Sequence, residues 1–129
     1  MNVGFVGLGV MGRPMARNLM KGGHALHLFS RSGVPAELVA EGGRACASGR
    51  EVGERAEVIF SMVPDTADVE RVLFGEGGVA EGLSPGKTFV DMSSISPLAT
   101  KELAARLAAL GCEYVDAPVS GGDVGAREA

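Results

Sequence analysis

Residues 5–19, FVGLGVMGRPMARNL, contain three glycines within six positions, directly after an apolar run and directly before a helical pattern. Gly7, Gly9 and Gly12 have the spacing G-x-G-x-x-G, which provides a tight turn, a point of close backbone approach and a close helix contact, in that order. The free N–H groups and the positive end of the helix dipole could receive a dinucleotide pyrophosphate there. Because the chain has 20 glycines, the spacing alone is not decisive, and the flanking elements have to be considered.

The elements that flank these glycines have the order that a dinucleotide-binding unit requires. Residues 3–6 are a short apolar run, typical of a parallel strand that is buried on both faces. The spacing of apolar residues predicts a helix over 12–21, which the glycines at 22 and 23 end. A second strand, ALHLF, is predicted over 25–29. The order is therefore strand, glycine turn, helix and strand.

Strands and helices continue to alternate through the rest of the chain. Further strands are predicted over residues 57–63, 87–92 and 112–118. Helices are predicted to begin at three caps, which are Ser48 in a capping box with Glu51, then Asp65 or Thr66, and then Ser96 followed by Pro97. This alternation implies parallel βαβ units with right-handed crossovers. The predicted fold class is therefore α/β, with a doubly wound parallel sheet.

Composition and charge limit the class of protein. At 129 residues the chain has the length of one domain with a single core. Its net charge of −4 gives no reason to expect nucleic acid or an anionic membrane as a partner. No apolar run approaches the roughly 20 residues of a membrane span and the N-terminus resembles no targeting segment, so we expect a soluble, cytoplasmic chain. Cys46 and Cys112 lack zinc-site spacing, which predicts buried reduced thiols and no metal site.

The end of the second predicted strand bears on cofactor choice. Sites that select NAD usually place an acidic residue there, about twenty residues after the glycines, to bind the ribose hydroxyls. Here the sequence is FSRS, so that Arg31 offers planar donors suited to a 2′-phosphate, and Ser30 and Ser32 add hydroxyl donors. This pattern favours NADP as the cofactor, with NAD as the second candidate. The alternative is an exposed loop arginine without a partner.

Three segments of the chain resemble those of one known family and follow each other in the same order. The segments are FVGLGVMGRPMARNL at 5–19, VDMSSISP at 90–97 and DAPVSGGDVGAR at 116–127. Together they resemble the β-hydroxyacid dehydrogenases, the family of 3-hydroxyisobutyrate dehydrogenase. The residues DMSSISP and GAR are most similar to those of the branch that reduces tartronate semialdehyde (2-hydroxy-3-oxopropionate). Imine reductases share the opening glycines but usually lack DAPVSGG, which makes them a poorer match.

The resemblance implies a Rossmann-like NAD(P)-binding domain over residues 1–129 and an oxidoreductase that acts on a small hydroxy acid or oxo acid, of the 2-hydroxy-3-oxopropionate/glycerate or 3-hydroxyisobutyrate type. Oligomeric state is left open, a homo-oligomer included. By the same resemblance, Ser94 would contact the cofactor near its nicotinamide, and Ser120, Gly121 and Gly122 would bind the substrate. The other implied cofactor contacts are Gly7, Leu8, Gly9, Val10, Met11, Gly12, Met62, Val63 and Pro64.

No catalytic residue is assigned within these residues. In the family a lysine acts as general acid, and no position of this sequence matches it, since Lys87 and Lys101 fall elsewhere in the pattern. We therefore expect the domain to be incomplete at its C-terminal end, without the family's all-helical second domain. Two hypotheses stay open: the cofactor domain of a dehydrogenase, or a noncatalytic dinucleotide-binding or interaction module. A reading frame that continues past Ala129 would favour the first.

Overall fold

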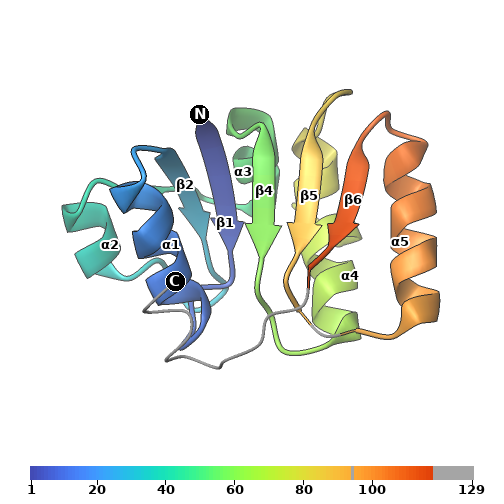
Figure 1. Ribbon diagram of the computed structural model, residues 1–129, viewed down its shortest axis with the longest axis horizontal. Helices are drawn as coiled ribbons and strands as arrows, with labels where there is room; N and C mark the ends of the chain where they lie inside the picture. The colour runs from blue at the N-terminus through green and yellow to red at the C-terminus, as the bar shows by residue number, and fades with distance from the viewer. Residues whose placement is uncertain (94, 118–129) are drawn as a thin grey trace.

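The computed structural model describes residues 1–93 and 95–117 of the chain. Its centre is a parallel sheet with the strand order β3-β2-β1-β4-β5-β6 (Figure 1). The strands are β1 (Asn2–Val6), β2 (Ala25–Phe29), β3 (Arg44–Ala45), β4 (Val58–Ser61), β5 (Thr88–Asp91) and β6 (Glu113–Asp116). The chain leaves β1 toward one edge and crosses from β3 to β4 on the other side of β1, which confirms the predicted doubly wound sheet.

Helices connect the strands and begin where the caps predict. They are α1 (Gly12–Lys21), α2 (Ala36–Ala40), α3 (Gly49–Arg55), α4 (Thr66–Phe74), the short 3-10 helix η1 (Val79–Gly82) and α5 (Pro97–Ala108). Ser48, Asp65 and Ser96 each accept a hydrogen bond from the backbone N–H three residues later. Asp65 rather than Thr66 is thus the cap of α4. The carboxylate of Glu51 binds the N–H of Ala47 instead of Ser48, so the capping box is shifted by one residue.

One predicted strand is too long, and one strand was not predicted. The strand predicted over 57–63 is shorter, because the chain turns away from the sheet after Ser61 to form the loop that contains Met62 and Val63. The edge strand β3 was not predicted, since it has only two residues, both exposed, and no apolar run to mark it. It pairs with His27 and Leu28 of β2.

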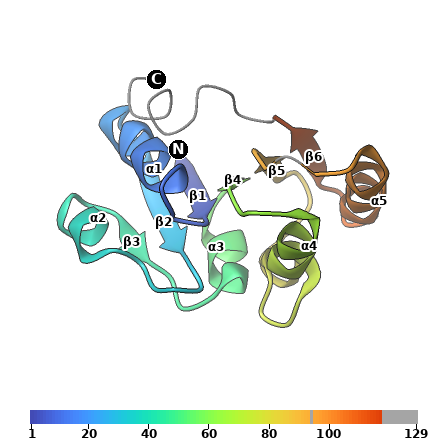
Figure 2. The same cartoon turned by 90° about the horizontal axis from the view of Figure 1, so that it is seen from below.

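Helices cover both faces of the sheet, as Figure 2 shows for α1 on one side and α3 and α4 on the other. Each face has its own apolar core. Phe5 of β1 packs with residues of α1, β2 and α2 on the first face, whereas the neighbouring Val6 packs with residues of α3, α4 and α5 on the second. The continuous apolar run of β1 is explained by this burial on both sides.

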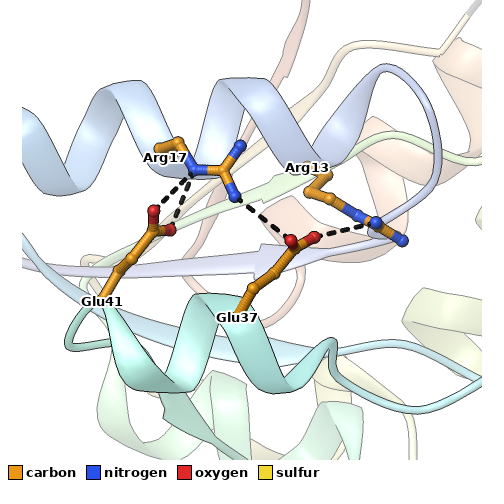
Figure 3. A network of polar contacts seen from close by, with 4 residues as sticks. All are labelled: Arg13, Arg17, Glu37 and Glu41. Carbon is orange, nitrogen blue, oxygen red and sulfur yellow. Dashed lines mark hydrogen bonds and ion pairs between the residues drawn. The ribbon is translucent and has the colours of Figure 1, made fainter.

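The short helix α2 is joined to α1 by ion pairs across the protein surface (Figure 3). Arg13 pairs with Glu37 at 2.9 Å, and Arg17 pairs with Glu41 at 2.9 Å and with Glu37 at 3.9 Å. Exposed pairs of this kind contribute about 1 kcal/mol or less each. They orient α2, whose Leu38 is fully buried and supplies its main packing contact.

The two cysteines are free and buried, as predicted. Burial raises the pKa of the Cys46 thiol to about 11, so that the thiol stays protonated at neutral pH. Within residues 1–93 and 95–117, histidines, cysteines and carboxylates form no group of three that could hold a metal ion. In the same part of the chain, no helix is both long and apolar enough to span a bilayer.

Candidate functional site

A cleft of about 1130 Å³ opens at the carboxyl ends of β1, β2 and β4. In doubly wound sheets this is the switch point where ligands bind, because the loops after neighbouring strands diverge there. The predicted cofactor residues that line it are Gly7, Leu8, Gly9, Val10, Met11, Gly12, Ser30, Arg31, Ser32, Met62, Val63 and Pro64. Ser94, Ser120, Gly121 and Gly122 lie outside the described residues.

The three glycines of the turn meet three different requirements. Gly7 has a φ of +95°, which disfavours a side chain, and its N–H donates to Phe29 O at 3.1 Å. A Cβ on Gly12 would collide with the carbonyl oxygen of Gly7, so the first turn of α1 can pack there only without a side chain. A Cβ on Gly9 would have no atom of residues 1–93 or 95–117 within 4 Å, its chain neighbours aside. The packing of the described residues therefore does not require glycine at position 9, and the space that they leave beside it can admit a ligand.

The N-terminus of α1 faces this cleft without a side-chain cap. Met11 occupies the N-cap position and makes no capping bond, and the first turn contains no acidic residue. In contrast, α3, α4 and α5 are each capped by a serine or aspartate. Uncapped N–H groups and the positive end of the helix dipole suit an anionic group such as a pyrophosphate. The open side of Gly9 and this uncapped terminus thus fit a dinucleotide.

Arg31 lies at the mouth of the cleft with its side chain 70% exposed. Its Nη1 atom is 3.7 Å from Oδ1 of Asp68, so the exposed guanidinium has one carboxylate nearby. The hydroxyls of Ser30 and Ser32 lie 3.2 Å apart beside it. These three residues present a guanidinium and two hydroxyls together at the end of β2.

The cleft also contains residues that sequence analysis did not select. Asp68 and Arg71 belong to α4, are joined by an ion pair of 3.0 Å, and line the cleft next to Arg31. Their spacing of three residues is typical of ordinary helix surfaces, so no sequence signal separated them from solvated charges. The remaining lining residues that were missed are Val6, Phe29, Ser48, Gly49, Val72, Glu76, Gly77 and Gly78.

A buried polar network fixes the neighbouring loop after β5. Asp91 is fully buried and accepts hydrogen bonds from Ser61 Oγ at 3.3 Å, Ser93 N at 2.9 Å and Tyr114 Oη at 2.6 Å. Ser93 Oγ in turn accepts a bond from the N–H of Val63 at 2.9 Å. Burial and the hydrogen bond to Asp91 raise the pKa of Tyr114 far above its usual value. Its hydroxyl therefore stays protonated and acts as the donor of this bond. The network ties the β5 loop to the cleft wall at Val63.

The lysines are placed away from this cleft. Lys87 donates to the carbonyl oxygens of Gly53 at 2.6 Å and Glu54 at 3.1 Å, at the amino end of β5. Lys21 ends α1, and Lys101 is exposed on α5. None of the three lines the cleft formed by the described residues.

Comparison with known proteins gives consistent matches. Residues 2–129 match the family described as the NAD binding domain of 6-phosphogluconate dehydrogenase. The chain is 52% identical to 2-hydroxy-3-oxopropionate reductase of Escherichia coli over 128 residues, covering 99% of this chain and 44% of that protein. The crystal structure of 3-hydroxyisobutyrate dehydrogenase from Salmonella typhimurium superposes with a TM-score of 0.90 at 39% identity, covering 99% of this chain and 45% of that one.

A further solved structure contains a cofactor. It is described as Psf3 in complex with NADP+ and 2-OPP, and it has a TM-score of 0.88 at 30% identity, covering 98% of this chain and 45% of that one. The chain thus spans less than half the length of each of these proteins. The predicted Rossmann-like fold and the predicted family resemblance are both confirmed.

Proposed function

Because the chain belongs to the β-hydroxyacid dehydrogenase family and carries its NAD-binding domain, we propose that the cleft binds NADP(H) in preference to NAD(H). The observation that carries this proposal is Arg31, exposed at the end of β2 where NAD-selective sites usually place an acid. Ser30 and Ser32 add donors for a 2′-phosphate. The NADP+ in the similar Psf3 structure gives further support.

The other contacts follow from the shape of the cleft. The pyrophosphate would lie against Gly9 and the uncapped start of α1, and Met62, Val63 and Pro64 would flank the adenosine half. The bound nicotinamide would carry the hydride in the reaction. Ser94 would contact the cofactor near that ring, and Ser120, Gly121 and Gly122 would hold the substrate. Residues 1–129 would in this way act as the cofactor-binding domain.

The proposed reaction is the NADP(H)-dependent interconversion of a small β-hydroxy acid and its oxo acid. The name and 52% identity of the Escherichia coli relative favour 2-hydroxy-3-oxopropionate as the oxo acid. A hydroxyl and two unhindered backbone N–H groups, as in Ser120 to Gly122, are suited to a carboxylate or hydroxyl of such a substrate. The donor of the proton to the carbonyl oxygen would be a group other than the three lysines of this sequence.

Arg31→Ala tests the cofactor preference. We expect the dissociation constant for NADPH to rise about tenfold or more and that for NADH to change by less than about twofold, because only the 2′-phosphate needs the guanidinium. Titration calorimetry on the purified protein measures both. Arg55→Ala is a matched control, since Arg55 is 56% exposed and lies outside the cleft lining. Tighter binding of NADH than of NADPH by the parent protein would contradict the proposal.

A turnover assay distinguishes a cofactor-binding domain that needs further residues for catalysis from an enzyme that is active by itself. Residues 1–129, purified alone, are expected to bind NADPH without reducing 2-hydroxy-3-oxopropionate, because none of the three lysines lines the cleft that the described residues form. The loss of NADPH absorbance during incubation with the oxo acid measures the rate. A rate that persists after rigorous removal of host reductases, and that Arg31→Ala lowers, would show that the proton donor lies within these residues.

A further inference from the structure

We propose that Arg71 is a second specificity-determining cation, which binds the adenosine 2′-phosphate together with Arg31; this inference rests on the proposed preference for NADP(H). Arg31 follows β2 and Arg71 lies in α4, yet both line the same cleft. Their Nη1 atoms lie 3.7 Å and 3.0 Å from the same oxygen, Oδ1 of Asp68. The two guanidiniums are therefore neighbours in the cleft lining, on either side of one carboxylate oxygen.

The charge balance of the cleft explains why one arginine is not enough. A phosphate monoester carries a charge of about −1.5 to −2 at neutral pH. The charged residues that line the cleft, within the part of the chain that the structure describes, are Arg31, Arg71, Asp68 and Glu76. Without Arg71, the described lining of the cleft would carry one guanidinium and two carboxylates, and its net negative charge would disfavour a dianion. With both arginines, the carboxylates are balanced and two planar sets of donors face the phosphate.

The side chains are also free to exchange partners. Arg31 and Arg71 are 70% and 54% exposed, so neither is held by packing. The distance of 3.7 Å between Arg31 and Asp68 is too long for a direct hydrogen bond, which leaves its donors available to a ligand. Asp68 is only 22% exposed, and its backbone N–H donates to the cap Asp65. It is a positioning residue, which keeps the two arginines side by side before the ligand arrives.

Binding measurements on the purified protein test this assignment. Arg71→Ala is expected to raise the dissociation constants for NADPH and for 2′,5′-ADP about tenfold, and to change that for NADH by less than about twofold. The compound 2′,5′-ADP carries the 2′-phosphate without the nicotinamide half, so an equal effect on both places Arg71 at the adenosine end. Arg71→Lys should give an intermediate loss for NADPH, because it keeps the charge but not the planar fork.

The matched control is again Arg55→Ala, since Arg55 is 56% exposed and, like Arg71, is ion-paired within its own helix. It should leave all three constants unchanged. Suppose that the parent protein prefers NADPH and that Arg31→Ala abolishes this preference. If Arg71→Ala then weakens the binding of NADPH and NADH equally, or of neither, the Arg71 assignment is wrong and the proposed function stands. If the parent prefers NADH or binds neither nucleotide, both are wrong.

Discussion

Gly12→Ala is expected to destabilise the protein by about 3 kcal/mol or more, whereas Gly9→Ala should preserve stability and abolish tight dinucleotide binding. The two glycines lie three residues apart in one turn but meet opposite surroundings. A Cβ at position 12 would overlap the carbonyl oxygen of Gly7 and approach the ring of Phe5 at 3.1 Å. Backbone cannot move aside as a flexible side chain can, so the start of α1 would have to shift.

At position 9 the added methyl group would meet no atom of the part of the chain that the structure describes within 4 Å. Alanine there should keep the free energy of unfolding or raise it by about 0.5 kcal/mol, because it restricts the unfolded chain. The same methyl group would occupy the place where the pyrophosphate approaches the backbone, so the dissociation constant for NADPH should rise at least about tenfold. Urea unfolding measures the first effect and calorimetry the second. Unchanged NADPH binding by Gly9→Ala would show that the ligand does not lie against the turn.

Asp91→Ala is expected to lower the free energy of unfolding by about 3–5 kcal/mol. The carboxylate is fully buried and accepts the hydrogen bonds of Ser61, Ser93 and Tyr114, so its removal leaves two buried donors and one half-buried donor without an acceptor as well as a cavity. Tyr114→Phe is the graded comparison. It removes one donor and retains the ring that stacks on Phe89, so the loss should be about 1–2 kcal/mol.

Denaturation in urea measures whether Asp91→Ala loses more stability than Tyr114→Phe. NADPH binding adds a second measurement. Because Ser93 joins Asp91 to the N–H of Val63 in the cleft wall, Asp91→Ala should also weaken NADPH binding in conditions where the variant remains folded. Equal stabilities of Asp91→Ala and the parent protein would mean that water replaces the carboxylate, and that the network does not hold the loop after β5.

Much of the fold could be predicted because its signals are local. The apolar run before Gly7, the helical spacing after Gly12 and the caps Ser48 and Ser96 each lie within a few residues of the element that they define. β3 and η1 carry no such signal, since the former is an exposed pair of residues and the latter a single turn. Family resemblance then extended the prediction to the cofactor residues from Gly7 to Pro64 that line the cleft.

The sequence by itself determined the order of strands and helices, the glycine turn and the cation at the end of β2, because each depends on neighbours along the chain. Only the tertiary structure decided which distant residues share the site. Parallel strands bring their carboxyl ends to one edge of the sheet, so Arg31 comes to face Asp68 and Arg71 although some forty residues separate them in sequence. Asp91 likewise acquires its role from Ser61 and Tyr114, thirty and twenty-three residues away. Charged and polar residues have the same local pattern on a solvated helix or strand as in a site, and only the packing of the sheet distinguishes the two.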